Sequence, residues 1–268
     1  MQPFFGQLEK SFASPNKFSI ENVSSNQLKP IFILGLPRSG STLLEQMMAN
    51  HLEIETAGEV NYLSSEVVTQ LQKMTGKPYP LDIDKLSSKQ YQQLGKIYLS
   101  ELKKHHPNSE YIIDKLPSNF QSLGLIKRIL PDAVVIHITR QPEAVAISIF
   151  ANYFAENEPY FCDLNEFAEY YVSYKKLMDF WKEEQQDNFL EISYETLVLS
   201  PKKAITKLLE SFGLHWQERC LDFHTNSRTI TTLSSNQVRK PLYKSSLNQW
   251  KHYQEFLEDF TSKININN

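Results

Sequence analysis

Residues 35–42, Gly-Leu-Pro-Arg-Ser-Gly-Ser-Thr, have the glycine spacing of a loop that binds phosphate. The backbone N–H groups of such a turn, and of the helix that follows it, attract an anion. The loop lacks the lysine of nucleoside triphosphatases, because Ser41 occupies that position, and it offers Arg38 instead. Mg²⁺-dependent chemistry on a triphosphate is therefore disfavoured. We expect an anion with less charge at its reacting end, held by Arg38, Ser39, Gly40, Ser41 and Thr42.

The elements on either side of this loop are predicted from the hydrophobic pattern. Pro30–Gly35 is a short apolar run typical of a buried strand, and Ser41–Asn50 repeats apolar residues at helical spacing. The same reasoning predicts further strands at Tyr111–Asp114, Ala133–Thr139 and Phe189–Ser193. Further helices are predicted from Pro142 to about residue 154, over residues 166–182, and from Pro201 to a stop at Gly213.

Strands that alternate with helices predict an α/β fold, here a P-loop-type, mainly parallel sheet flanked by helices. Ligands of such folds gather at the carboxyl ends of the strands, which directs attention to residues 35–42, 114–119 and 140–142. We expect residues 1–29 to form an N-terminal extension and residues 30–268 a single domain. The aromatic stripe of residues 166–182 is typical of core packing, with a wall of the acceptor pocket as the alternative.

The bulk composition excludes several classes of function. A formal net charge of −3 gives no general attraction for nucleic acid, so an anion must be held by local cations. No stretch approaches the roughly 20 apolar residues that cross a bilayer, and the N-terminus lacks the pattern of a signal peptide. Cys162 and Cys220 show no paired spacing, and the histidines show no metal-ligand spacing. We therefore expect no disulfide, no metal, no membrane partner and a cytoplasmic location, while the oligomeric state stays open.

The segment PIFILGLPRSGSTLLEQM resembles the 5′-phosphosulfate-binding segment of sulfotransferases. The resemblance is greatest to the tyrosylprotein sulfotransferases and to bacterial domains often fused to tetratricopeptide repeats. It continues in order to about residue 258, through residues 51–59 (HLEIETAGE), 114–120 (DKLPSNF), 135–150, 192–201 and 234–243. It implies the sulfotransferase fold and transfer of a sulfuryl group from PAPS (3′-phosphoadenosine 5′-phosphosulfate) to an acceptor hydroxyl, with PAP as product and no metal. The acceptor stays open among tyrosine, other phenols, sugars and lipid alcohols.

The resemblance implies catalytic roles for four residues. Glu59 would be the general base that takes the proton of the acceptor hydroxyl. Lys115 would neutralise the bridging oxygen as its bond to sulfur breaks, and Arg38 the sulfuryl oxygens. Ser234 would help to stabilise the transition state, with its neighbour Ser235 as the alternative. If Glu59 is not the base, His51 in the same segment is the next candidate.

The resemblance also assigns donor-binding residues outside the loop. Arg140 and Ser148 match the arginine and serine that hold the 3′-phosphate, and Tyr194 matches a tyrosine that borders the nucleotide. Arg239 and Lys240 would add positive charge beside the same phosphate.

Two positions depart from the family pattern. Asn152 and Gln249 stand where the tyrosylprotein enzymes have an arginine and a lysine, which weakens donor affinity unless Lys240, Lys244 or Lys251 compensates. Two other functions are kept as alternatives. One is a P-loop kinase or nucleoside triphosphatase, disfavoured by Ser41, and the other is a non-catalytic nucleotide-binding protein.

Overall fold

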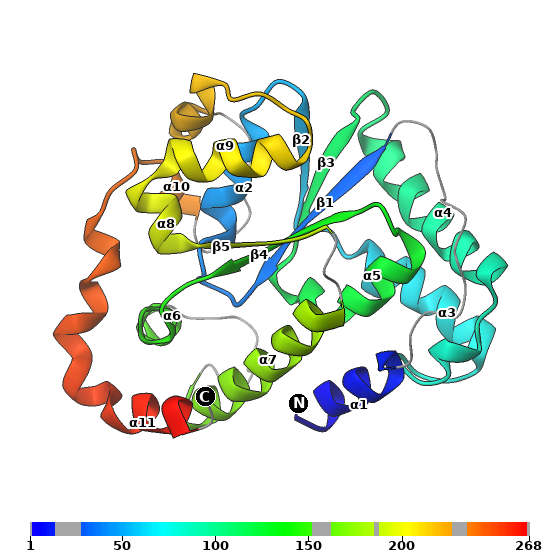
Figure 1. Cartoon of the computed structure of the whole chain (residues 1–268), viewed down its shortest axis with the longest axis horizontal. Coiled ribbons are helices and arrows are strands. Elements are labelled where there is room, and N and C mark those ends of the chain that lie inside the picture. The colour runs from blue at the N-terminus through cyan, green and yellow to red at the C-terminus, as the bar shows by residue number, and fades with distance from the viewer. Residues whose placement is uncertain (1, 14–27, 152–161, 185–187, 227–234, 267–268) are drawn as a thin grey trace.

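The computed structural model describes residues 2–13, 28–151, 162–184, 188–226 and 235–266. These residues form a five-stranded sheet whose strands lie in the order β2-β3-β1-β4-β5, with every neighbouring pair parallel. Helices cover both faces of the sheet (Figure 1). The predicted α/β class is confirmed, and the described sheet is wholly parallel. Its strands are β1 Lys29–Gly35, β2 Ile54–Gly58, β3 Tyr111–Lys115, β4 Val134–Thr139 and β5 Phe189–Ser193.

The helices connect these strands and fill the two outer layers. The α-helices are α1 Gln2–Phe12, α2 Ser41–Ala49, α3 Val68–Thr75, α4 Ser88–His105, α5 Leu123–Ile129, α6 Pro142–Phe150, α7 Leu164–Glu184, α8 Tyr194–Leu199, α9 Pro201–Ser211, α10 Ser235–Val238 and α11 Glu258–Ile266. The π-helical turn is η1 Leu63–Val67, and the 3₁₀ segments are η2 Ile83–Lys85, η3 Pro117–Ser122, η5 Glu218–Thr225, η6 Ser245–Leu247 and η7 Gln249–Leu257.

The central strand β1 serves both layers because successive side chains of a strand point to opposite faces. Phe32 and Leu34 pack into the hydrophobic core on the side of α1, α3, α4, α5, α6, α7 and α11. Ile31 and Ile33 pack into a second core beneath α2, α8 and α9. This two-sided burial explains why the segment reads as a continuous apolar run rather than as an alternation.

The aromatic stripe of α7 packs into the first core. Phe167, Tyr174 and Trp181 are all buried there, so the interpretation of this helix as core is confirmed. The N-terminal helix α1 joins the same core through Phe5, Leu8 and Phe12. The ring of Phe12 meets that of Trp181 edge-on, with 5.4 Å between the ring centroids.

Several elements differ from the sequence prediction. Helices α1, α3 and α4 were not predicted. Strand β2 was not predicted, because it lies at the edge of the sheet and buries only its first residue well, so its sequence IETAG carries no apolar run. Helix α6 ends at Phe150, and most of its predicted continuation lies outside the described residues.

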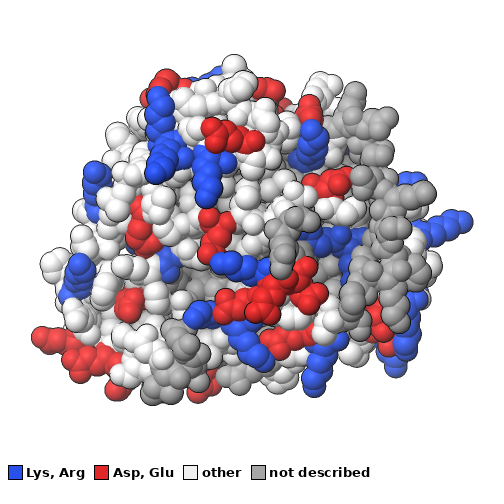
Figure 2. Space-filling view, viewed as in Figure 1, with Lys and Arg blue, Asp and Glu red and all other residues white. Residues whose placement is uncertain are grey.

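The surface has no single charge sign on the face seen in Figure 2, where acidic and basic side chains are interspersed. Among the described residues, no helix is long and apolar enough to span a membrane.

Candidate active site

The loop between β1 and α2 has a backbone shape that few residues tolerate. Gly40 precedes α2 with a φ of 102°, and a β-carbon at this position would collide with the ring of Tyr194. Arg38 also has a left-handed φ, of 68°. For a residue with a side chain this conformation costs about 1–2 kcal/mol. Arg140, which follows β4, helps to offset this cost by donating a hydrogen bond from Nη1 to the carbonyl oxygen of Arg38 at 3.0 Å.

The start of α2 offers hydrogen-bond donors to an anion. No side chain caps the first turn at Gly40, and the helix dipole adds partial positive charge there. Ser39 Oγ and Arg140 Nε are buried and have no hydrogen-bond partner among the described residues. Unpaired buried polar atoms cost about 1–3 kcal/mol each. These donors therefore fit a bound phosphate or sulfate group that would complete their hydrogen bonds.

Arg38, which is buried, and Arg140, which is partly buried, bring two cations to this loop. Arg38 donates from Nε to Ser148 Oγ at 2.9 Å and from Nη2 to Gln237 Oε1 at 3.1 Å. Arg140 donates from Nη2 to the carbonyl oxygen of Ser246 at 3.0 Å. Burial lowers the pKa of both guanidinium groups, and the charge of Arg140 lowers that of Arg38 further.

The arginines are held mainly by neutral groups. The guanidinium carbon of Arg140 lies 4.4 Å from the ring centroid of Tyr194, whose hydroxyl bonds to Ser246 Oγ at 2.8 Å. No carboxylate among the described residues forms an ion pair with Arg140. The charge of Glu195 acts on Arg140 without forming such a pair. A partly buried cation that forms no ion pair favours an anionic ligand.

Two adjoining hollows open at this cluster. Both are lined by Arg38, Arg140, Tyr194, Gln237 and Tyr243. The first also includes Thr42 and Lys240, and the second Ser148 and Gln249. The two arginines are therefore accessible from both hollows.

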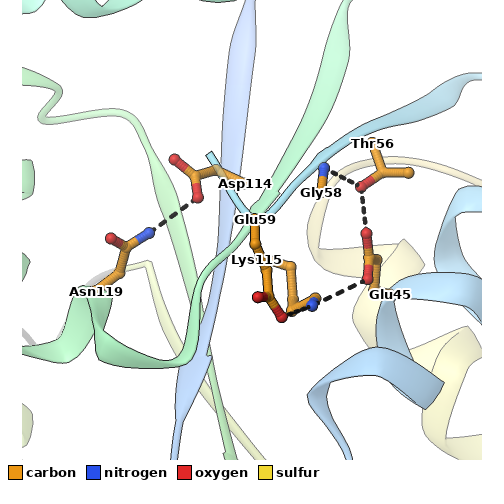
Figure 3. A network of polar contacts seen from close by, with 7 residues as sticks. All are labelled: Glu45, Thr56, Gly58, Glu59, Asp114, Lys115 and Asn119. Carbon is orange, nitrogen blue, oxygen red and sulfur yellow. Dashed lines mark hydrogen bonds and ion pairs between the residues drawn. The ribbon is translucent and has the colours of Figure 1, made fainter. Parts of the chain in front are cut away.

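A second polar group lies at the ends of β2 and β3 (Figure 3). The ammonium group of Lys115, the last residue of β3, donates to Glu59 Oε1 and forms an ion pair with it. Lys115 Nζ also lies 3.6 Å from Glu45 Oε2, on the second turn of α2. Lys115 and Glu45 are almost fully buried, whereas about a third of the Glu59 side chain is exposed. Glu59 is thus the carboxylate of this group that is exposed to solvent.

Asp114, the residue before Lys115, is fully buried and points away from the ion pair (Figure 3). It accepts hydrogen bonds from the Tyr98 hydroxyl at 2.7 Å and from Asn119 Nδ2 at 2.9 Å. Burial raises the pKa of this carboxyl group to about 7, against the effect of both hydrogen bonds and of Lys115. Asp114 therefore changes protonation near neutral pH and fixes the turn that follows β3.

The structure separates the predicted site residues into two groups, both at the carboxyl ends of the parallel strands. Arg38, Arg140, Ser148 and Tyr194 contact one another at the ends of β1, β4 and β5, while Glu59 pairs with Lys115 at the ends of β2 and β3. Helix α2 links the groups, since Ser41 begins it beside the loop and Glu45 follows one turn later. The rise between these two helix positions is about one turn, or 5.4 Å.

The remaining predicted residues lie around these groups. Ser41 and Thr42 are buried in the first turn of α2, and Lys240 lines the first hollow. Arg239 is exposed and donates from Nη1 to the carbonyl oxygen of Asn226. Ser234 and Asn152 lie outside the described residues, and Ser235 is described only as the first backbone position of α10.

His51, the reserve candidate for the base, has both ring nitrogens occupied. Its Nδ1 accepts from the backbone N–H of Glu53 at 3.1 Å, so Nε2 carries the proton and donates to the carbonyl oxygen of His215 at 2.9 Å. The ring is buried. His51 therefore joins two chain segments, and both of its ring nitrogens are engaged in hydrogen bonds.

Sequence reasoning did not single out Glu45, Gln237 or Ser246. Glu45 carried a signal, since it is the one charged residue in the helix STLLEQMMA, all of whose residues are buried. Gln237 and Ser246 carried none, because they belong to a polar region whose contacts with Arg38 and Arg140 depend on the tertiary fold.

The described parallel sheet, with a glycine turn between a central strand and its helix, is the architecture of the sulfotransferase fold. The model of the sulfotransferase family matches residues 30–218. This chain belongs to the sulfotransferase family.

Several solved structures share its fold. The sulfotransferase domain from the Synechococcus PCC 7002 olefin synthase aligns with a TM-score of 0.60 and 22% identity, over 85% of this chain and 89% of that one. The sulfotransferase domain from the curacin biosynthetic pathway aligns with a TM-score of 0.60 and 17% identity, over 88% and 99% of the two chains. Mouse sulfotransferase SULT7A1, solved in complex with PAP, aligns with a TM-score of 0.54 and 18% identity, over 97% and 88%.

Related sequences include longer proteins. An uncharacterized protein of Aquifex aeolicus (strain VF5) is 32% identical over 237 residues, which are 85% of this chain but only 31% of that protein. Protein-tyrosine sulfotransferase 1 of Danio rerio is 23% identical over 262 residues, 93% of this chain and 73% of the fish protein. The chain thus spans about a third of the first relative and about three quarters of the second.

Proposed function

We propose that this protein transfers a sulfuryl group from PAPS to an acceptor hydroxyl. The observation that carries this proposal is the Lys115–Glu59 ion pair at the same sheet edge as the phosphate loop. It combines a proton acceptor and a cation beside a site suited to an anion. Family membership supports sulfuryl transfer over other reactions at such a site.

PAPS would be held by two sets of hydrogen-bond donors around the loop, one for each of its phosphate ends. Arg38, Ser39, Gly40, Ser41 and Thr42 would bind the 5′-phosphosulfate through side chains and backbone N–H groups. Arg140 and Ser148 would bind the 3′-phosphate, with Tyr194, Arg239 and Lys240 beside the nucleotide. The unpaired Ser39 Oγ and Arg140 Nε support this assignment, since both would gain acceptors. When bound, PAPS supplies the sulfuryl group and a good leaving group.

The chemistry would be an in-line displacement. Glu59 takes the acceptor's proton while the acceptor oxygen forms a bond to sulfur and the bond from sulfur to the bridging oxygen breaks. Lys115 stabilises the negative charge that develops on this leaving oxygen, and Arg38 that on the sulfuryl oxygens. The products are the sulfated acceptor and PAP. Every charge in this scheme is balanced by side chains and amides, so no metal is required.

The acceptor would be a small molecule or peptide that carries a hydroxyl group, with a tyrosine or other phenol among the first to test. Support for tyrosine comes from relatives named protein-tyrosine sulfotransferases. A P-loop kinase or nucleoside triphosphatase is a weaker candidate because Ser41 replaces the lysine that offsets a triphosphate's charge. Among the described residues, no group of three or more His, Cys, Asp or Glu side chains could hold a metal ion.

The deciding experiment uses PAPS labelled in its sulfuryl group, with a panel of a tyrosine peptide, a small phenol, a sugar and an aliphatic alcohol. We expect labelled product from at least one acceptor, and the same rate in EDTA. Turnover of Mg-ATP in place of PAPS would favour a kinase or nucleoside triphosphatase. Tight PAP binding without turnover across the panel would favour a non-catalytic nucleotide-binding protein.

A further inference from the structure

The buried carboxylate of Glu45 has no role in the scheme above, although it lies against the proposed catalytic lysine. It is only 3% exposed, in a helix whose other residues are apolar or polar but uncharged. Burying an isolated carboxylate is costly, so its position requires compensating contacts. Two such contacts are present, one to Lys115 and one to Thr56.

These contacts form a chain of hydrogen bonds and ion pairs that returns to Glu59 (Figure 3). The backbone N–H of Gly58 donates to Thr56 Oγ1 at 3.0 Å, and the Thr56 hydroxyl donates to Glu45 Oε1 at 2.6 Å. The other oxygen, Glu45 Oε2, lies 3.6 Å from Lys115 Nζ. Since Lys115 also pairs with Glu59, the residue after Gly58, the chain closes into a ring through the backbone. The ring fixes the orientation of the Glu45 carboxylate before any ligand binds.

The ammonium group thus lies between two carboxylates with different surroundings. Glu59 is partly exposed and able to reach a substrate, whereas Glu45 is buried and bonded on both sides. When Glu59 accepts a proton its negative charge disappears, and a buried ammonium group without a partner would favour its neutral form. Glu45 leaves Lys115 a negative partner at that moment.

We propose that Glu45 is a positioning residue that keeps the Lys115 ammonium group charged and in place while Glu59 exchanges its proton. The catalytic part of this inference rests on the proposed sulfuryl transfer. Burial raises the pKa of Glu45 above its ordinary value, and the charge of Lys115 opposes part of this rise, which agrees with a carboxylate that depends on this lysine. Charged groups that act on the pair are Glu59 at the end of β2 and Asp114 on β3.

The first test measures the Lys115 side chain directly, by NMR of ¹³C-labelled lysine assigned with Lys115→Arg. Removing a neighbouring carboxylate disfavours the ammonium form, so Glu45→Gln should lower the pKa of Lys115 by about one unit or more. This readout requires no turnover and is therefore independent of the proposed reaction. An unchanged Lys115 pKa in folded Glu45→Gln would overturn the inference.

The second test separates positioning from donor binding. Glu45→Gln should lower kcat by roughly 10- to 100-fold, in line with a shift of one to two units in a catalytic group, while PAP affinity stays within about threefold. Thr56→Val removes the hydroxyl donor and should give a smaller loss in kcat, whereas Thr56→Ser retains it and should restore the rate. Thr56→Val keeps the test decisive if Glu45→Gln does not fold.

A double-mutant cycle completes the design. In a Lys115→Met background, Glu45→Gln should cause no further loss, because a residue that acts through Lys115 has nothing left to position. Additive losses would show that Glu45 acts elsewhere and would contradict the inference. If the wild-type protein shows no turnover with any acceptor, the proposed function and the catalytic part of this inference both fail, and the Lys115 pKa still decides whether Glu45 holds that side chain.

Discussion

The ring of Tyr194 lies directly against Gly40, in the space that a β-carbon at that glycine would occupy. Tyr194 begins α8 after strand β5, and Gly40 precedes α2 after the loop. A residue that closes the phosphate loop and a residue proposed to border the nucleotide are therefore in contact before a nucleotide binds. This contact makes the loop's shape depend on a side chain more than 150 positions away.

Gly40→Ala should abolish most PAP binding, because the methyl group forces either Tyr194 or the loop to move. The matched control is Gly213→Ala, since Gly213 also has a left-handed φ, of 75°, but no atom within 4 Å of its β-position. Gly213→Ala measures the effect of backbone strain alone, about 1–2 kcal/mol, without a steric clash. Isothermal titration calorimetry with PAP should show loss for Gly40→Ala alone. Equal binding by the two variants would mean that the Tyr194 contact is unimportant.

Glu59→Gln should retain PAP binding and lose activity, because the amide preserves size but accepts no proton. General bases typically contribute about 10²–10⁴-fold, and the loss should appear in kcat with an aliphatic alcohol. It should shrink with a phenol, whose pKa near about 10 makes its proton easier to remove.

The control for that experiment is Glu66→Gln, an exposed carboxylate on η1. It should behave as wild type in both assays. A near wild-type rate for Glu59→Gln with an aliphatic alcohol would require another base, and the bonded ring of His51 makes it a poor replacement.

Arg140→Ala should weaken PAP binding more than binding of 5′-AMP, which lacks the 3′-phosphate. Hydrogen bonds to charged groups contribute about 1.5–3 kcal/mol, so the PAP-specific loss should be roughly 10- to 100-fold. The comparison variant is Arg239→Ala, whose exposed side chain should matter less. Equal losses for both nucleotides would indicate that Arg140 acts by holding the loop through the Arg38 carbonyl, rather than on the 3′-phosphate.

The buried Asp114 should make stability depend on pH. Its pKa of about 7 lies above the ordinary value of 3.8, so between these limits the folded protein holds a proton that the unfolded chain releases. Stability from this group is therefore present below pH 4 and lost as the pH rises to 7, by at most about 1.4 kcal/mol per pH unit.

Asp114→Asn should remove the contribution of this carboxyl group to the decrease of unfolding free energy with rising pH. It should also lower the stability at pH 5, because Tyr98 and Asn119 donate to different oxygens of Asp114, and the amide replaces one of these acceptors with an NH₂ donor. Asp84→Asn, at an exposed position, should keep the wild-type slope. Denaturant titrations at pH 5, 6, 7 and 8 measure it, and an unchanged slope in Asp114→Asn would contradict the assignment.

The sequence was sufficient for those parts of the fold in which local pattern and tertiary burial agree. Strands β1 and β3 were predicted to within one residue, because their apolar runs are buried on both faces. Strand β5 was predicted with its observed bounds from its apolar residues, although it lies at the edge of the sheet and only Ile192 is buried. Edge strand β2 was missed, since Glu55 and Thr56 give it no apolar signature.

In the candidate site, too, some features were predictable from the sequence and others were not. Arg38 and Glu59 lie in motifs that could be recognised, yet the sequence did not indicate that the Arg38 guanidinium would bond to Ser148 and Gln237. Such contacts join chain segments 110 and 199 positions apart. They follow from the order of the strands and from side-chain packing, which local patterns do not encode.

The strand order also determines how late in synthesis the central strand β1 can pair with its neighbours. Strand β1 is made first of the five but lies at the centre, and its pairing with β3 begins at Tyr111, 82 residues after Lys29. Its other neighbour is complete only at Thr139. At about 5–20 residues per second, the ribosome needs roughly 5 to 20 seconds to deliver both partners. A nascent chain interrupted before that point would display an unpaired apolar strand, the kind of segment that chaperones bind.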